Sequence, residues 1–72
     1  MRLREFRVKK WLTLNEFAAL VGCNAATICQ IELGRALPSF KIARKILKAF
    51  EIEVEEIDEI KESQVKALLG RR

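Results

Sequence analysis

Residues 13–33 read TLNEFAALVGCNAATICQIEL, and this stretch contains the signals for two short helices joined by a tight turn. Thr13 and Glu16 have the spacing of a capping box, in which each side chain accepts a hydrogen bond from the other residue's backbone N–H. We therefore expect a helix to begin at Leu14. Gly22 is the residue type that most readily adopts the left-handed conformation after a helix, so the helix is expected to end there.

A second helix is expected immediately after this turn. Asn24 is among the best N-cap residues and favours a helix over residues 25–33. Ile28 and Ile31 give this helix an inward apolar face, because side chains three and four residues apart lie on the same side of a helix. Two helices joined within a few residues at a glycine are typical of a helix-turn-helix.

The flanking sequence has the same helical spacing of apolar residues. A helix over residues 3–10 would place Leu3 and Phe6 inward, and Ser39 is expected to cap a helix over residues 40–50. The residues of the 40–50 helix that we expect to be buried are Phe40, Ala43, Ile46, Leu47 and Phe50. Its lysine and arginine side chains are expected to remain in solvent.

The C-terminal residues are expected to form two further helical segments. One is an acidic helix around residues 54–60, and the glutamates of residues 51–62 are expected to form a solvated face. The other is a short amphipathic helix that follows Ser63 and ends at Gly70. The sequence thus predicts an all-α chain of five helices plus a short C-terminal helix. We divide it into a domain of residues 1–60 and a C-terminal extension of residues 61–72, which is a candidate dimerisation helix.

The charge distribution favours a polyanionic partner. The chain has 72 residues and a net charge of +4, and a fold of this size has room for neither a second domain nor a large enclosed active site. Residues 1–50 contain ten Lys and Arg against three Glu, whereas residues 51–72 contain four basic and seven acidic residues. We therefore expect the body to bind a polyanion and the acidic tail to serve another purpose.

Several residue types that catalysis and metal binding require are scarce or absent in the sequence. There is no histidine, and Cys23 and Cys29 are too few for a zinc site and give no disulfide framework. Because the sequence has no nucleophile and base pair and no phosphate-binding glycine loop, we expect no enzyme activity, no catalytic residue, no cofactor and no metal. The charged N-terminus and short apolar runs predict neither a signal peptide nor a membrane span, and we expect a cytoplasmic protein.

Spaced motifs along the chain match the pattern of a known family. They are Leu3-Arg4-Glu5-Phe6-Arg7, Leu12-Thr13, Glu16-Phe17-Ala18, Val21-Gly22, Thr27-Ile28, Ile31-Glu32, Gly34-Arg35, Pro38-Ser39, Ile46 and Ala49-Phe50. Together they resemble the Cro/Xre-type phage-repressor DNA-binding domain over about residues 3–57. The resemblance implies a five-helix, repressor-like bundle that sets the 25–33 helix in the major groove of double-stranded DNA. It also implies a two-fold dimer on a palindromic site.

The resemblance and the helix faces indicate which residues meet DNA. Gln30 is expected to read base edges, with Ala25 and Ala26 beside it. The expected phosphate contacts are Thr13, Leu14, Asn15, Thr27, Arg35 and Lys41. The resemblance also implies a structural ion pair between Arg7 and Glu32.

Four positions depart from the family pattern. Ala25 and Ala26 stand where family members often have longer polar residues that read bases, and alanine offers only an apolar contact, for example with a thymine methyl. Leu14 stands where family members often have a glutamine that contacts phosphate, so it offers only its backbone N–H. Trp11 stands where a small residue or glycine commonly ends the first helix. We interpret Trp11 either as a partly buried packing residue or as an anchor for a partner.

We expect the chain to be a sequence-specific, DNA-binding transcriptional regulator that needs no cofactor. The alternative is a protein-interaction module, such as an antitoxin or an anti-repressor partner, with weak or no DNA binding. Such a module would bind a protein through the acidic segment and the terminal helix. The near-neutral 25–33 helix favours the alternative, and the basic first fifty residues oppose it.

A homodimer interface is expected in the C-terminal half, because its apolar side chains exceed what such short helices easily bury alone. These side chains are Ile57, Ile60, Val65, Leu68 and Leu69. In the competing interpretation the terminal helix folds back on its own domain, beside Val54 and Phe50.

Overall fold

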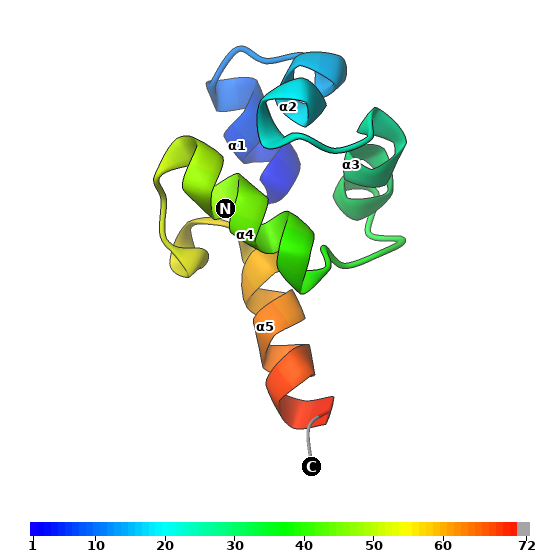
Figure 1. Ribbon diagram of the computed structural model, residues 1–72, viewed down its shortest axis with the longest axis vertical. Helices are drawn as coiled ribbons and strands as arrows, with labels where there is room; N and C mark the ends of the chain where they lie inside the picture. Colours follow the sequence, from blue (N-terminus) through cyan, green and yellow to red (C-terminus); the bar gives the residue numbers. More distant parts are fainter. Residues whose placement is uncertain (71–72) are drawn as a thin grey trace.

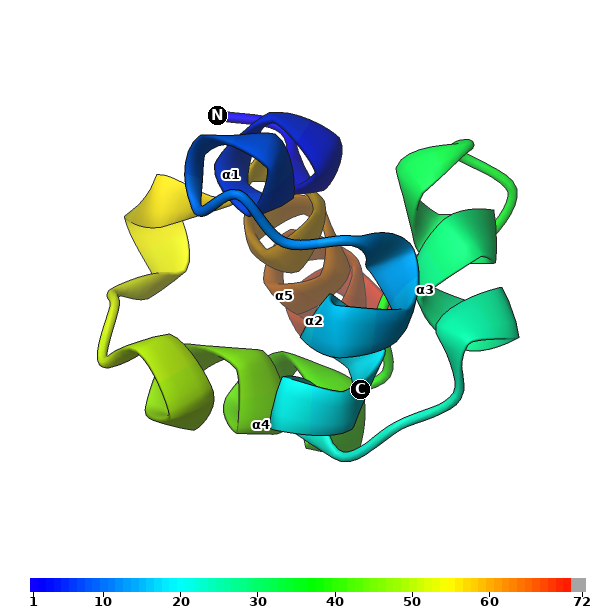
Figure 2. The same cartoon turned by 90° about the horizontal axis from the view of Figure 1, so that it is seen from above.

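The computed structural model describes the backbone of residues 1–70 and the side chains of residues 1–65, and the described backbone forms helices and turns without a strand. The elements are α1 (Leu3–Lys9), α2 (Leu14–Val21), α3 (Ala25–Glu32), α4 (Phe40–Phe50), the 3-10 turn η1 (Val54–Glu56) and α5 (Asp58–Gly70). Helices α1 to α4 form a bundle from which α5 projects (Figure 1). Seen from above, α1, α3 and α4 are arranged around the axis of α5 (Figure 2). The all-α, five-helix prediction is confirmed.

The predicted helix starts are confirmed as well. The side chains of Thr13, Asn24 and Ser39 accept hydrogen bonds from backbone N–H groups in the first turns of α2, α3 and α4. Helices α1 and α3 each end one residue earlier than expected, because Lys10 and Leu33 are their C-cap residues. Local sequence signals thus determine where these helices begin and end.

The prediction of a helix over residues 54–60 is wrong. Val54–Glu56 form one turn of 3-10 helix, and α5 begins only at Asp58. Between them the backbone of Ile57 is extended, and the N–H of Asp58 donates to the carbonyl of Met1 at 2.8 Å. Pairing with the N-terminal segment therefore interrupts the helix at this point.

Helix α5 continues through Ser63, so the separate short helix expected there is the second half of α5. Ser63 caps no new helix, because its hydroxyl donates to the carbonyl of Pro38 at 2.6 Å. The boundary that we expected between residues 60 and 61 lies within this one helix. None of the helices in residues 1–70 is long and apolar enough to cross a membrane.

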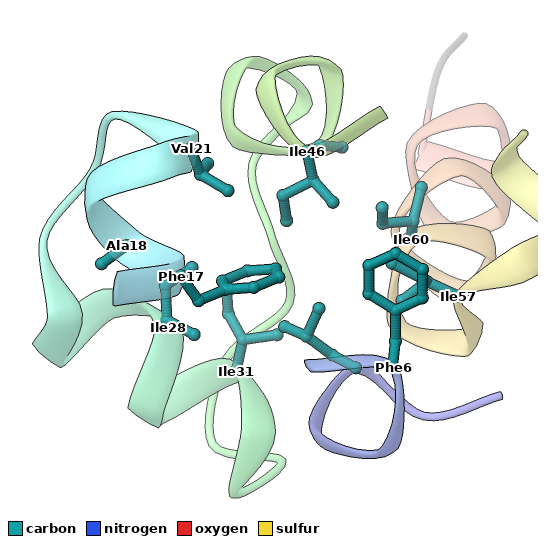
Figure 3. Close-up of a cluster of buried hydrophobic side chains, with 11 residues drawn as sticks. Phe6, Phe17, Ala18, Val21, Ile28, Ile31, Ile46, Ile57 and Ile60 are labelled. Atoms are coloured by element: carbon teal, nitrogen blue, oxygen red, sulfur yellow. The ribbon is translucent and has the colours of Figure 1, made fainter. Parts of the chain in front are cut away.

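The core is a single cluster to which every α-helix contributes (Figure 3). Its buried apolar side chains are Leu3, Phe6, Phe17, Ala18, Val21, Ile28, Ile31, Ala43, Ile46, Ile57 and Ile60. Phe50 packs against this cluster, with its ring centroid 5.2 Å from those of both Phe6 and Phe17. The contacts join the end of α4 to α1 and α2.

Part of the predicted core of α4 is wrong. Phe40 is 64% exposed, and its ring lies 5.9 Å from the guanidinium carbon of Arg44. Pro38, two residues earlier, occupies the buried position at this end of the helix. Leu47 and Phe50 are half-buried at the edge of the core rather than inside it.

The predicted dimer face in the C-terminal half also needs correction. Ile57 and Ile60 are fully buried in the core of their own domain, so they are not available to a second copy. Ile57 and the start of α5 thus pack on their own domain, whereas the competing interpretation placed the helix after Ser63 there, and that part of α5 projects from the bundle. Val65 is 55% exposed, and the side chains of Leu68 and Leu69 lie outside the described residues.

Candidate nucleic-acid interface

Helices α2 and α3 cross closely because small residues form the turn between them. Ala18 is buried, and its carbonyl accepts hydrogen bonds from the N–H groups of Gly22 at 2.8 Å and Cys23 at 3.0 Å. Gly22 has φ +84°, and a Cβ there would meet no atom within 4 Å. Glycine is therefore required for its left-handed backbone and not for space. The predicted helix-turn-helix geometry is present.

The N-terminus of α2 has a complete capping box. The Thr13 hydroxyl accepts the N–H of Glu16 at 3.1 Å, and the Glu16 carboxylate accepts the N–H of Thr13 at 2.9 Å. The N–H groups of Leu14 and Asn15 have no partner among the described residues. Donors of this kind at the positive end of a helix dipole suit a phosphate.

The outward face of α3 is short and nearly uncharged. Ile28 and Ile31 point into the core, whereas Ala26, Thr27 and Gln30 are exposed. The other candidate base-reading residue, Ala25, is half-buried and packs against the core. Gln30 is thus the one exposed residue of this face with an amide that can pair with a base edge.

The six candidate phosphate contacts differ in what they present. The side chains of Thr13, Asn15, Thr27, Arg35 and Lys41 are exposed. The side chain of Leu14 is half-buried and packs against the core, so only its N–H is available. Arg35 follows α3, and Lys41 lies in the first turn of α4, so both flank the loop between these helices.

Arg7 and Glu32 form an ion pair between α1 and α3. Nε of Arg7 lies 2.7 Å from Oε2 of Glu32, and the two side chains are only 13% and 8% exposed. Hydrogen bonding to Glu32 raises the pKa of Arg7 above its ordinary value. Nη1 of Arg7 also donates to the carbonyl of Leu12 at 2.9 Å. One guanidinium therefore holds α1, the α1–α2 loop and α3 together.

A family model described as helix-turn-helix matches residues 3–57, about three quarters of the chain. The chain belongs to the helix-turn-helix family. The match runs from the start of α1 to Ile57, so it includes the whole α1–α4 bundle with its α2–α3 crossing.

Relatives of this helix-turn-helix protein are known from archaea. Two from Archaeoglobus fulgidus, both called uncharacterized HTH-type transcriptional regulators, are 39% and 41% identical over 56 residues. The aligned residues make up 78% of this chain and 80% and 79% of those relatives. A third relative of the same description, from Methanocaldococcus jannaschii, is 38% identical over 56 residues, which are 78% of this chain and 85% of the relative. No solved structure matches the chain.

One buried charge in this helix-turn-helix protein escaped the sequence analysis. We expected the glutamates of residues 51–62 to form a solvated face, but Glu59 is 1% exposed. Its Oε1 accepts the N–H of Leu3 at 2.8 Å, and its Oε2 lies 3.3 Å from Nη2 of Arg2. Nothing local in the sequence signals these contacts, because Glu59 is more than fifty residues from both Leu3 and Arg2 along the chain.

This helix-turn-helix protein also has an open hollow along α4 that is lined by basic residues. This open hollow of about 530 Å³ is lined by Phe40, Lys41, Arg44, Lys45, Leu47 and Lys48. Nζ of Lys45 donates to the carbonyl of Gly22 at 3.2 Å, so this lysine of α4 reaches the turn between α2 and α3. The spacing of the basic residues predicts one positive face, but the exposure of Phe40 within it could not be anticipated.

Proposed function

We propose that the protein is a transcriptional regulator that binds double-stranded DNA with α3 in the major groove. The carrying observation is the α2–α3 crossing itself. It leaves the polar outer face of α3 exposed next to an open, positively polarised N-terminus of α2. Family membership over the same residues and the description of the relatives as transcriptional regulators support this function.

Base recognition in this proposal depends mainly on Gln30. Its amide can pair with N6 and N7 of adenine, and the exposed methyl group of Ala26 offers an apolar contact to a thymine methyl. Ala25 contributes less, because it is half-buried against the core. So few direct contacts imply that DNA shape supplies part of the selectivity.

Phosphate contacts surround this reading face. The N–H groups of Leu14 and Asn15, together with the side chains of Thr13 and Asn15, hold one phosphate at the start of α2. On the other side, Thr27 of α3 and the cations Arg35 and Lys41 neutralise the backbone.

The contacts of the acidic segment weaken the alternative of a protein-interaction module. Asp58, Glu59 and Glu62 lie within salt-bridge distance of the N-terminal ammonium group or the guanidinium of Arg2. Much of the negative charge in α5 is thus used within the domain, where it fastens α5 to the N-terminal segment. Apart from Arg2 and Arg7, the basic residues of 1–50 form no salt bridge among the described residues and remain available for DNA.

We further propose that the regulator is a cytoplasmic homodimer that represses by occupying an operator. A two-fold dimer places two recognition helices roughly 34 Å apart, as a palindromic site requires. Because Ile57 and Ile60 are buried, the dimer contact is assigned to the projecting half of α5, where Val65 is exposed. A single Val65 side chain is a small surface, so DNA is expected to strengthen the pairing.

Binding to a random-sequence duplex at increasing salt tests the function. A DNA-binding regulator shows a logarithm of affinity that falls linearly with the logarithm of salt concentration, because bound cations release counterions. A protein-interaction module shows no such salt-dependent affinity. Absence of binding even at low salt would therefore reject the proposed function.

A further inference from the structure

Trp11 occupies a backbone position that normally belongs to glycine. Its φ is +60°, in the left-handed region. Its N–H donates to the carbonyl of Val8 at 2.9 Å, and the N–H of Leu12 donates to that of Arg7 at 3.4 Å. This pair of bonds is the Schellman ending of a helix, in which glycine avoids the steric cost of a Cβ. The same chain uses glycine, Gly22, after α2, whereas Trp11 after α1 and Glu51 after α4 are side-chain-bearing residues in the left-handed region.

The side chain of Trp11 provides no packing that would offset this cost. It is 93% exposed, the highest value among the exposed large apolar side chains of the described residues. The interpretation of Trp11 as a partly buried packing residue is therefore wrong. A strained backbone that carries an unpacked tryptophan does not stabilise the domain, and such a residue points to a contact outside it.

The loop that carries Trp11 is fixed relative to α3. Nη1 of Arg7 donates to the carbonyl of Leu12, the next residue, at 2.9 Å. The same guanidinium is paired with Glu32 at the end of α3. Leu12 also packs against the core. Trp11 is thus held at a set place beside the helix-turn-helix, so little ordering entropy is lost when it meets a partner.

The surroundings of Trp11 fit a polyanion. Lys9 and Lys10, which precede it, are both exposed, and no acidic residue lies between Glu5 and Glu16 in the sequence. The carboxylate of Glu16 is occupied by its capping bond to the N–H of Thr13. An indole N–H is a donor without acceptor capacity, and its ring is apolar. The two lysine ammonium groups and the indole N–H suit the phosphates of a nucleic-acid backbone, and the apolar indole ring suits its sugars.

We propose that Trp11 contacts the DNA backbone next to the N-terminus of α2, with its indole N–H donating to a phosphate oxygen and its ring lying against the adjacent deoxyribose. This inference rests on the proposed function, because it needs DNA seated on α2 and α3. It extends the proposed interface from Thr13, at the start of α2, back to Trp11 in the α1–α2 loop.

Substitution of Trp11 distinguishes a DNA contact from a structural role. Loss of a DNA contact lowers the affinity for DNA while relief of backbone strain raises the melting temperature. Trp11→Gly relieves the left-handed strain, so the melting temperature should rise by roughly 4–8 °C. The same variant should bind a random-sequence duplex of about 20 base pairs roughly tenfold more weakly, because a hydrogen bond to a charged group is lost. Trp11→Phe, which keeps a ring without the N–H, should lie between the two in affinity.

Glu51→Gly is the matched control. Glu51 is exposed, has φ +52° and ends α4 as Trp11 ends α1. The control should also melt at a higher temperature, but its DNA affinity should not fall, since it removes a negative charge. A Trp11→Gly protein that binds DNA as tightly as the native chain, or that melts at a lower temperature, would overturn the inference.

Fluorescence distinguishes failure of this inference from failure of DNA binding. Trp11 is the only tryptophan in the chain, so quenching of its emission by acrylamide reports its exposure. Anisotropy of a dye-labelled duplex reports binding independently. Binding accompanied by protection of Trp11 from acrylamide is expected. Binding without protection overturns the Trp11 contact alone, whereas no binding at low salt overturns the proposed function. If Trp11 becomes protected from acrylamide when the protein concentration is raised in the absence of DNA, Trp11 takes part in self-association. That result would also overturn the proposed contact between Trp11 and DNA.

Discussion

The guanidinium of Arg7 donates hydrogen bonds to both carboxylate oxygens of Glu32, from Nε at 2.7 Å and from Nη2 at 3.2 Å. The two residues are 25 positions apart and belong to α1 and α3. The third nitrogen of the guanidinium, Nη1, donates to the carbonyl of Leu12. The pair therefore fixes the α1–α2 loop and α3 in one arrangement.

Removing Arg7 should destabilise the domain strongly. Arg7→Ala leaves the nearly buried carboxylate of Glu32 charged and unpaired, and the free energy of unfolding should fall by about 3 kcal/mol in urea denaturation. Arg7→Lys keeps the charge without the paired geometry, so its loss should be smaller. A change below about 0.5 kcal/mol for Arg7→Ala would mean that the pair behaves as a solvated surface contact.

Glu59 should stabilise the docking of α5 on α1. Glu59→Ala leaves the buried N–H of Leu3 without its acceptor, and we expect a loss of about 1–3 kcal/mol in the free energy of unfolding. Glu59→Gln retains an oxygen for that N–H and should cost less. The control is Glu62→Ala, since Glu62 pairs with Arg2 across half-exposed side chains and its removal should cost less than about 1 kcal/mol. Equal losses for Glu59→Ala and Glu62→Ala would contradict the buried role of Glu59.

The contact between Glu59 and Leu3 marks the limit of what the sequence predicts, whereas the Arg7–Glu32 ion pair was expected from the family resemblance. Thr13, Gly22 and Asn24 act through their own backbone neighbours, so the bounds of α2 and the start of α3 could be predicted from local signals. Glu59 and Leu3 meet only when both ends of the chain are in place. A glutamate in an acidic stretch gives no sign of such burial.

In the candidate interface, too, some features could be predicted from the sequence and others could not. The exposure of Gln30 follows from helical spacing, since Ile28 and Ile31 take the core face. The exposure of Phe40 does not, because the periodicity of α4 places Phe40 on the same face as the buried Ala43, although Pro38 and not Phe40 is buried at this end of the helix. The left-handed backbone of Trp11 is likewise invisible to residue preferences, which place glycine at such turns.

Gln30 should read one adenine. Gln30→Ala is expected to weaken binding to a preferred site by about 1–3 kcal/mol and to leave binding to random DNA nearly unchanged. The partner atom can be tested directly with 7-deazaadenine, which lacks the N7 acceptor. Placing it at the recognised position should weaken the native protein but not the Gln30→Ala variant. Equal weakening of both proteins would show that Gln30 does not contact that base.

Arg35 and Lys41 should neutralise phosphates without selecting sequence. Changing either residue to alanine should weaken binding to all duplexes similarly and reduce the slope of log affinity against log salt by about one unit. Lys61→Ala is the control, because Lys61 is an exposed cation on α5 and is not among the proposed phosphate contacts. If the control changes the slope as much as Arg35→Ala does, the slope reports net charge and not contact.

Val65 should lie in the proposed dimer contact. A charged side chain at this exposed position should block pairing without disturbing the core, so Val65→Glu is expected to remain folded by circular dichroism and to be monomeric in sedimentation equilibrium. The native chain should dimerise in the presence of a palindromic duplex. A native chain that binds this duplex only as a monomer would reject the proposed homodimer.

Selection of bound sequences from a random pool of duplex DNA tests the central claim, that α3 reads the major groove, most directly. We predict enrichment of a short motif that contains an adenine, and its loss from the enriched set when the selection is repeated with the Gln30→Ala variant. A pool from which the native protein enriches no sequence, or the same motif enriched by both proteins, would contradict recognition by this face of α3.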